Sequence, residues 1–134
     1  SFPTRRSSDL VNMGWVGFDL DRTLAYYSLE QKELIGEPIP HILELVKKLI
    51  HEGKDVRIFT ARANIDSYNG NHNLLEYHLQ LIREWCNTHI GKILPITCSK
   101  DFNTEKIYDD IAVHVIPNKG KLVGDFISTH IMVD

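Results

Sequence analysis

Short apolar runs and longer amphipathic stretches alternate along this chain. The first apolar run, Trp15 to Phe18, leads into two acids, Asp19 and Asp21, and a second run over residues 55–60 ends at Thr60. Brief apolar runs that are bounded by polar residues are typical of buried parallel strands. Three further runs predict later strands, at residues 93–98, 107–108 and 112–116.

Two stretches between these strands have apolar residues at helical spacing, as helices that pack on a sheet do. Pro38 and Pro40 open the first helix, because proline is well tolerated in a first turn, and Gly53 marks its end. The polar loop of residues 64–73 precedes the second. This helix is predicted to begin with a capping box formed by Asn73 and Glu76, and to end at Gly91.

Strands that alternate with helices in this order predict an α/β fold. Right-handed crossovers place such strands in a mostly parallel sheet, so we expect a three-layer α/β/α, Rossmann-like domain over residues 13–134. Residues 1–12 differ from the rest, because their first ten are polar, basic and aperiodic. They are expected to form a disordered tail and resemble translated adapter sequence, with Met13 as the native start.

Composition and charge narrow the classes of function. Of the 134 residues 43% are hydrophobic, and the net charge of −3 gives no reason to expect a nucleic-acid or membrane surface. No apolar run approaches the roughly 20 residues of a membrane span. Two cysteines, Cys86 and Cys98, are too few for a disulfide framework and fit a reducing compartment. We therefore expect a cytoplasmic protein.

Polar side chains at the carboxyl ends of four predicted strands carry the candidate chemistry. They are Asp19 and Asp21, then Thr60, then Lys100, then Asp109 and Asp110. A parallel sheet brings its carboxyl ends to one edge, where open α/β sheets bind ligands. On the first strand alone, a strand-exit turn capped by Asp21 or Thr23 explains the residues equally well. The full set of strand ends favours a site.

Charge repulsion indicates what such a site would bind. Clustered carboxylates repel each other unless a cation neutralises them, and all-oxygen ligation suits Mg²⁺, which also takes phosphate oxygens from its substrates. Lys100 and Thr60 would add a positive charge and a hydroxyl for a phosphoryl group, and a carboxylate can be the nucleophile in phosphoryl transfer. The residues therefore predict a Mg²⁺-dependent phosphoryl site.

Four motifs in order resemble those of the haloacid dehalogenase-like (HAD) hydrolases. Residues 18–24, Phe-Asp-Leu-Asp-Arg-Thr-Leu, match the DxDxT motif, and residues 58–60 resemble the second motif. Lys100 resembles the third motif and residues 108–110, Tyr-Asp-Asp, the fourth. The likeness extends from about residue 14 to residue 118, and the sequences around Thr60 and residues 85–97 resemble a small bacterial and phage subgroup with a minimal cap.

That resemblance implies a HAD-like fold and a catalytic role for four residues. Asp19 would be the nucleophile, and Asp21 would be the general acid for the leaving oxygen and later the base for water. Thr60 would hold the phosphoryl oxygens and Lys100 would stabilise their charge, with Lys106 as a rival for that lysine.

The metal site follows from the same resemblance. Mg²⁺ would be bound by Asp19, the backbone carbonyl of Asp21, and either Asp109 or Asp110. Two departures from the family pattern affect the site: Arg22 replaces a frequent glycine, and Ile111 stands where relatives often have arginine.

Neither insertion site is long enough for a large cap domain. Substrate choice would then depend on the connection of residues 25–37, with Tyr26 and Tyr27, and on Arg62 and the loop of residues 64–73. A connection of that length is typical of a lid or binding loop.

We therefore expect a Mg²⁺-dependent phosphatase that works through an aspartyl-phosphate. Its substrate would be a small phosphate ester, for example a nucleotide, or a polynucleotide 3′-phosphate end. A phospho-acceptor or metal-binding regulatory module without turnover is the alternative, and a simple partner-binding α/β domain is a third. The oligomeric state stays open.

Overall fold

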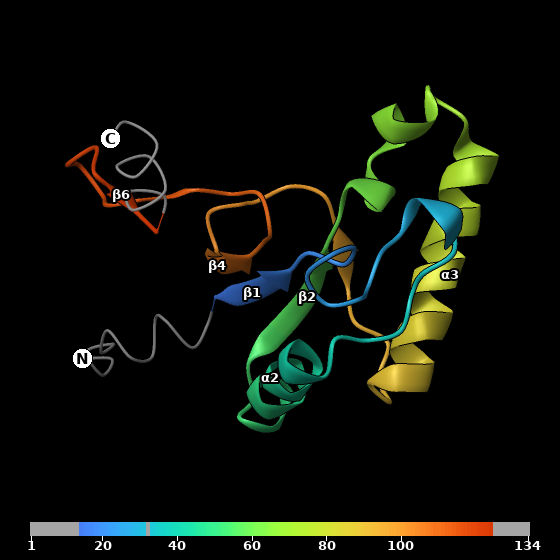
Figure 1. Cartoon of the computed structure of the whole chain (residues 1–134), viewed down its shortest axis with the longest axis horizontal. Helices are drawn as coiled ribbons and strands as arrows, with labels where there is room; N and C mark the ends of the chain where they lie inside the picture. The colour runs from blue at the N-terminus through green and yellow to red at the C-terminus, as the bar shows by residue number, and fades with distance from the viewer. Residues whose placement is uncertain (1–13, 32, 125–134) are drawn as a thin grey trace, which may run out of the picture.

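The computed structural model describes residues 14–31 and 33–124, and the predicted tail of residues 1–12 lies outside this part of the chain. A four-stranded sheet lies at its centre, with the strands in the order β3-β2-β1-β4 and every pairing parallel (Figure 1). The strands are β1 (Trp15–Phe18), β2 (Asp55–Phe59), β3 (Ile96–Thr97) and β4 (Thr104–Tyr108). The predicted α/β fold with a parallel sheet is therefore confirmed.

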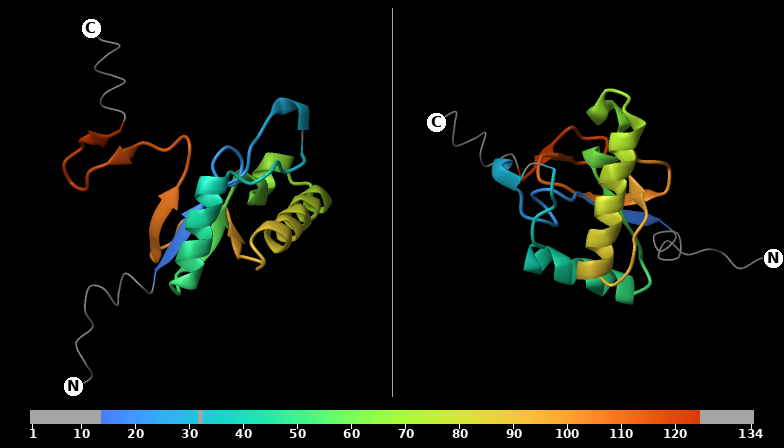
Figure 2. Two further views of the ribbon diagram at one scale, coloured as in Figure 1. Left: turned by 60° about the horizontal axis from the view of Figure 1, so that its bottom comes forward. Right: turned by 90° about the vertical axis from the view of Figure 1, so that its right-hand side faces the viewer.

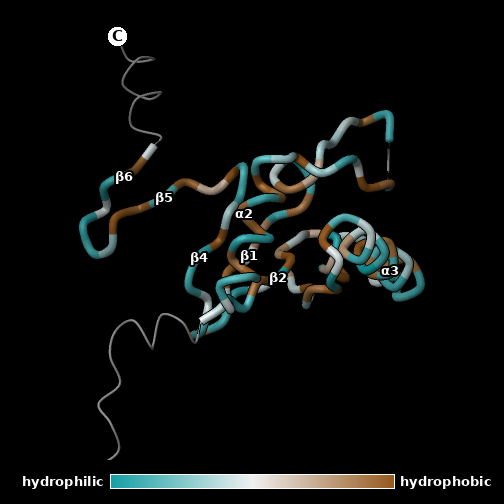
Figure 3. Tube along the Cα trace, turned by 90° about the horizontal axis from the view of Figure 1, so that it is seen from below, coloured by the Kyte–Doolittle hydropathy of each residue, from teal (hydrophilic) through white to brown (hydrophobic). Residues whose placement is uncertain are grey.

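Two long helices connect the first three strands. α2 (Pro40–His51) joins β1 to β2, and α3 (His72–His89) joins β2 to β3. Figure 3 shows apolar and polar residues alternating around the turns of α3, as an amphipathic helix requires. Pro40 is the first residue of α2, and Gly53 just beyond its end has a φ of 87°, so both predicted helix signals are confirmed.

The start of α3 differs from the prediction by two residues. Asn71, and not Asn73, is the N-cap, and its side-chain oxygen accepts a hydrogen bond from the backbone N–H of Leu74. Asn73 lies inside the first turn, so the expected capping box with Glu76 does not form. Both asparagines precede the apolar stripe, which is why the sequence alone did not distinguish them.

Both helices pack against the same face of the sheet. Val16, Phe18, Val56 and Ile58 from that face form one buried cluster with Val46 of α2 and with Ile82, Trp85 and Cys86 of α3. The reason is topological. β1, β2 and β3 follow one another in a single direction across the sheet, and right-handed crossovers then lie on one side.

The opposite face of the sheet has a different composition. Trp15 lies there, buried, against the ring of Phe59 and beneath the guanidinium of Arg57. Neither α-helix of the described residues packs on this face, because the connection from β3 to β4 contains no helix. The expected three-layer arrangement is therefore not confirmed, and the described part has two layers.

The predicted strand of residues 112–116 does not join the sheet. Its central residues form β5 (His114–Val115), which pairs antiparallel with β6 (Leu122–Val123) in a separate hairpin. Figure 1 and the left view of Figure 2 show this hairpin on the opposite side of the molecule from α3. Its residues are almost all exposed.

No helix in residues 14–31 and 33–124 is long and apolar enough to cross a membrane.

The two connections beside the site are short and tightly bonded. Residues 19–39 carry one turn of 3₁₀-helix, η1 (Leu29–Gln31), and Ala25 forms single bridges with Asp21 and Pro38. Residues 60–71 hold two 3₁₀-helices, η2 (Ala61–Ala63) and η3 (Ile65–Tyr68). Among the described residues, neither connection contains a large cap domain.

Candidate active site

The carboxyl ends of β1 and β4 bring the first acids together. Phe18 is paired with Tyr108, and the two rings stack with centroids 4.5 Å apart. The backbone N–H of Asp19 continues the pairing by donating to the carbonyl of Tyr108 over 2.9 Å. The residues that follow, Asp19 on one strand and Asp109 on the other, are therefore neighbours by register.

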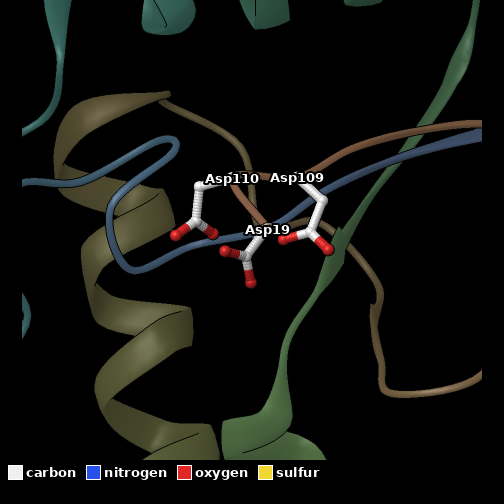
Figure 4. Close-up of side chains that lie close together, drawn as sticks. All are labelled: Asp19, Asp109 and Asp110. Carbon is white, nitrogen blue, oxygen red and sulfur yellow. The ribbon is translucent and has the colours of Figure 1, made fainter. Parts of the chain in front are cut away.

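Three carboxyl groups converge at this edge. One oxygen each from Asp19, Asp109 and Asp110 lies within 4.8 Å of the others, and Figure 4 shows Asp109 and Asp110 on either side of Asp19. The hydroxyl of Thr23 lies 3.4 Å from Oδ2 of Asp19 and 3.5 Å from Oδ1 of Asp110. Thr23 therefore contacts the acids directly as well as lying in the turn after β1.

The electrostatics of Asp19 reflect this crowding. Burial and the neighbouring acids Asp110, Asp109 and Asp21 raise the pKa of Asp19 to about 8. Burial alone would also raise the pKa of Asp110, but hydrogen bonds, first that from Asp19, and the nearby charge of Arg22 hold it below its usual value. The neighbouring carboxylates thus favour the protonated form of Asp19 when no cation is present.

This donor set fits a divalent cation. The three residues offer only carboxylate oxygens, which Mg²⁺ prefers, and one oxygen from each lies within 4.8 Å of the others. The elevated pKa of Asp19 indicates a site that lacks compensating positive charge. Asp19, Asp109 and Asp110 are the residues that would hold such an ion.

Asp21 is engaged by a different partner. Both of its carboxylate oxygens accept hydrogen bonds from Arg62, from Nε over 2.7 Å and from Nη2 over 2.9 Å. Such a two-pronged contact is the strongest geometry between arginine and a carboxylate. Asp21 points to Arg62 and is not part of the three-acid cluster.

Every N–H of the Arg62 guanidinium has a partner within the chain. Besides the two bonds to Asp21, Nη1 donates to the carbonyl of Glu33 and to Nδ1 of His78, and Nη2 donates to the carbonyl of Leu34. Arginine has five such donors. The substrate-binding role predicted for Arg62 is therefore not the role seen in this arrangement: the side chain is buried and joins Asp21 to residues 33–34 and to α3.

Thr60 and His78 complete the surroundings of Arg62. The hydroxyl of Thr60 accepts a hydrogen bond from the backbone N–H of Arg62 and thereby caps η2. His78 is buried and stacks on Tyr68, and burial, with the positive charge of Arg62, lowers the pKa of its ring. An arginine N–H can donate to Nδ1 only when that nitrogen carries no proton, so His78 is neutral in this arrangement.

A cavity of about 600 Å³ opens above these residues. Six predicted site residues line it, namely Asp19, Asp21, Thr60, Arg62, Asp109 and Asp110. Residues that the sequence pattern did not assign to a site also line it, among them Glu33, His78 and Cys98. His78 had one sequence signal, a polar residue on the apolar stripe of α3, and Glu33 had only its place in the predicted binding connection of residues 25–37.

Two aromatic residues of the connection after β1 behave differently. Tyr27 lines the cavity, whereas Tyr26 does not and is 56% exposed. Tyr26 therefore lies outside this cavity, and Tyr27 is the aromatic residue beside the acids. Ile111 also lines the cavity, where the family pattern often has arginine.

The candidate lysines lie outside this cavity. Lys100 and Lys106 line a different hollow, together with residues 101–102 and 104–107. After β3 the chain returns to the amino end of the sheet, where the carbonyl of Asn103 accepts from the N–H of Trp15, and Lys100 lies on that return. The structure does not bring Lys100 to the acids, although it follows a strand end as the sequence predicted.

Arg22 lies in the turn after β1, at a position to which the motif assigns no role. Its φ of 72° is left-handed, which explains why glycine is frequent at this place in the motif. Its guanidinium lies 4.8 Å above the centre of the Tyr27 ring, and both residues line the cavity.

Comparisons with known proteins add support for the fold only. No protein-family model matches the chain, and no curated protein matches it. A solved structure described as that of the conserved protein coded by a locus from Bacteroides thetaiotaomicron is similar with a TM-score of 0.52 and 22% sequence identity, over 89% of this chain and 93% of that chain. This likeness supports the α/β architecture over nearly the whole chain.

Proposed function

We propose that this chain is a Mg²⁺-dependent phosphohydrolase of the HAD type, acting on a phosphate monoester through an aspartyl-phosphate. The observation that carries the proposal is the convergence of Asp19, Asp109 and Asp110 at the carboxyl ends of two adjacent parallel strands. The DxDxT pattern on β1 and the acid pair after β4 are the residues that the HAD resemblance assigns to this chemistry.

The proposed reaction has two balanced steps. In the first, a carboxylate oxygen of Asp19 bonds to phosphorus, the bond from phosphorus to the leaving oxygen breaks, and Asp21 gives a proton to that oxygen. In the second, water attacks phosphorus and gives a proton to Asp21. The bond between phosphorus and Asp19 breaks, so phosphate is released and the Asp19 carboxylate is regenerated. Bound Mg²⁺ would supply positive charge that keeps Asp19 ionised and offsets charge on the phosphoryl oxygens.

The contact between Asp21 and Arg62 bears on the proton step. Both oxygens of Asp21 accept from the Arg62 guanidinium, and a proton on the carboxyl group removes the negative charge that strengthens those bonds, so we expect the contact to open when Asp21 carries a proton. Arg62 also bonds the carbonyls of residues 33 and 34, and the opening is therefore linked to the connection after β1.

Release of phosphate from p-nitrophenyl phosphate in the presence of Mg²⁺ tests this function. We expect activity in the wild type and loss of at least about a thousandfold in Asp19→Asn, since the nucleophile is removed. Asp66→Asn, which replaces an exposed acid on η3 outside the cavity, is the matched control and should keep full activity. Absence of hydrolysis across a broad panel of phosphate esters would refute the proposal.

A phospho-acceptor module without turnover is the second candidate. The observation in its favour is that Asp21 is held in an ion pair with Arg62. The two candidates differ in the decay of an aspartyl-phosphate trapped on Asp19. If Asp21→Asn leaves that decay unchanged, the module is correct; if it slows the decay strongly, the phosphatase is.

A further inference from the structure

A phosphoryl group in this cavity needs a positively charged side chain, and the identity of that side chain is not obvious. The question rests on the proposed phosphohydrolase function. A phosphate monoester carries up to two negative charges and would enter a cavity that five acids already line. HAD-like enzymes are expected to use a lysine here, and the sequence offered Lys100 or Lys106.

The two lysines lie in the wrong place for this task. Both line a hollow formed by residues 100–102 and 104–107, and neither lines the cavity that contains the acids. Among the described residues that line the acid cavity, the arginines are Arg22 and Arg62.

Arg62 has no donor left for a ligand. Its five N–H groups go to Asp21, Glu33, Leu34 and His78, and the side chain is only 9% exposed. Binding a phosphoryl group through Arg62 would require breaking bonds that hold the site together.

Arg22 meets the requirement. It is exposed, and its guanidinium makes no hydrogen bond or salt bridge with the residues that the structure describes. Two contacts fix its position. Its backbone N–H donates to the carbonyl of Ala25 over 2.8 Å in the turn after β1, and its guanidinium lies 4.8 Å above the centre of the Tyr27 ring at the cavity wall. The positive charge of Arg22 is already close enough to Asp110 to stabilise that carboxylate.

The backbone at Arg22 gives a further argument. A left-handed φ of 72° is strained for a residue with a Cβ, and glycine would adopt it freely. Strain of this kind is typical of functional positions, where a particular side chain is needed despite the conformation. The strain agrees with the placement of the side chain in the cavity.

We propose that Arg22 is the cation that binds the phosphoryl oxygens, in place of the lysine used by similar enzymes. The planar guanidinium can donate two parallel N–H bonds to two phosphoryl oxygens, and the Tyr27 ring holds that plane in the cavity. The site would therefore recognise a terminal phosphate monoester, whose oxygens are free on the side that faces Arg22.

Direct binding of inorganic phosphate tests the assignment without relying on turnover. Isothermal titration with inorganic phosphate at saturating Mg²⁺ should show binding to the wild type and at least tenfold weaker binding to Arg22→Gln. Arg22→Lys should fall between them, because a lysine keeps the charge and loses the paired donors. Arg57→Gln is a matched control: Arg57 also lies 4.8 Å above an aromatic ring, that of Trp15, and does not line the cavity.

The outcomes distinguish the assignment of Arg22 from the phosphohydrolase function on which it rests. Phosphate binding that Arg22→Gln weakens and Lys100→Ala does not supports Arg22. Binding that Arg22→Gln leaves within twofold of wild type, or that Lys100→Ala weakens instead, overturns the assignment while the phosphohydrolase function stands. A wild type that binds no phosphate refutes both. Arg22→Gly removes the backbone strain along with the side chain, so weaker binding in that variant cannot come from loss of folding.

Discussion

Arg62 donates to both carboxylate oxygens of Asp21, over 2.7 and 2.9 Å, from a position 41 residues further along the chain. The same guanidinium bonds the carbonyls of residues 33 and 34 and the ring of His78. One side chain thus connects the turn after β1, the connection that follows it, and α3. The predictions below begin with this arginine.

Arg62→Gln should lower the free energy of unfolding by about 3 kcal/mol, because it leaves a partly buried carboxylate without its partner. Urea denaturation measures the change. Arg83→Gln, which removes an exposed ion pair with Glu76 on α3, is the control and should cost less than about 0.5 kcal/mol. Equal stability of Arg62→Gln and wild type would mean that the contact with Asp21 is not formed in solution.

Asp19→Asn should stabilise the protein when no divalent cation is present. The folded pKa of Asp19, about 8, lies above its ordinary value of 3.8, so the folded state disfavours the carboxylate and loses stability as pH rises through this range. We expect a gain of about 1 to 2 kcal/mol at pH 7.5, reduced from the full shift because the group is partly exposed to solvent.

Thermal unfolding with EDTA and then with Mg²⁺ distinguishes the cause of that gain. Mg²⁺ should raise the unfolding temperature of the wild type more than that of Asp19→Asn, since the variant lacks one ligand. A variant that is less stable than the wild type in EDTA would contradict the proposed crowding of charge.

Arg22→Gly should raise the free energy of unfolding by about 1 kcal/mol, because glycine adopts a φ of 72° without strain. Arg22→Ala keeps a Cβ and should show no such gain. Chemical denaturation of the two variants side by side makes the comparison, and a larger gain for alanine than for glycine would rule out backbone strain as the cause.

His78 should make stability depend on pH. Its folded pKa lies below the ordinary value of 6.5, first because the ring is buried and second because Arg62 is close. The unfolded chain therefore takes up the proton first, and the free energy of unfolding should fall as pH drops through 6.5 and below. The charged groups that act on the ring are Arg62, Glu33 and Asp21.

The variant His78→Gln isolates this contribution. It should be less stable overall, since Gln cannot stack on Tyr68, but its unfolding free energy should decline less steeply between pH 7 and pH 5. One proton accounts for at most about 1.4 kcal/mol per pH unit. Parallel curves for wild type and variant would show that His78 does not titrate in this range.

The two asparagines at the start of α3 test the helix boundary. Asn71→Ala removes the side-chain cap on the N–H of Leu74 and should cost about 1 kcal/mol. Asn73→Ala, inside the first turn, should be neutral or slightly stabilising, because alanine is the better helix former. The reverse order of the two effects would restore the predicted capping box.

Much of the fold could be predicted because it depends on local patterns. Several local signals each predict one structure, a strand or a helix end. They are the run Trp15–Phe18, the proline at the start of α2, and Gly53 and Gly91 after the helices. The number of layers could not be predicted in this way. Whether helices cover one face of the sheet or both depends on the order of the strands, and β4 reached its place beside β1 without a helix.

Part of the candidate site could likewise be predicted from local patterns, and part could not. Asp19, Asp109 and Asp110 converge as predicted, because the register of β1 and β4 determines their neighbourhood. The contacts of Arg62 and the position of Lys100 could not be predicted, because side-chain direction depends on tertiary contacts. Nothing near Arg62 in the sequence reveals that Asp21, two backbone carbonyls and a histidine would use all its donors.

The pairing of β1 with β4 has a consequence for how the protein folds. Strands β1, β2 and β3 are joined by successive crossovers, whereas Trp15 is paired with Thr104 across nearly the whole described chain. Contacts of such long sequence separation form late, because the intervening chain must already be ordered. We expect the acids to meet only when β4 docks, so that a chain emerging from the ribosome completes its proposed metal site at the end of its folding and not before.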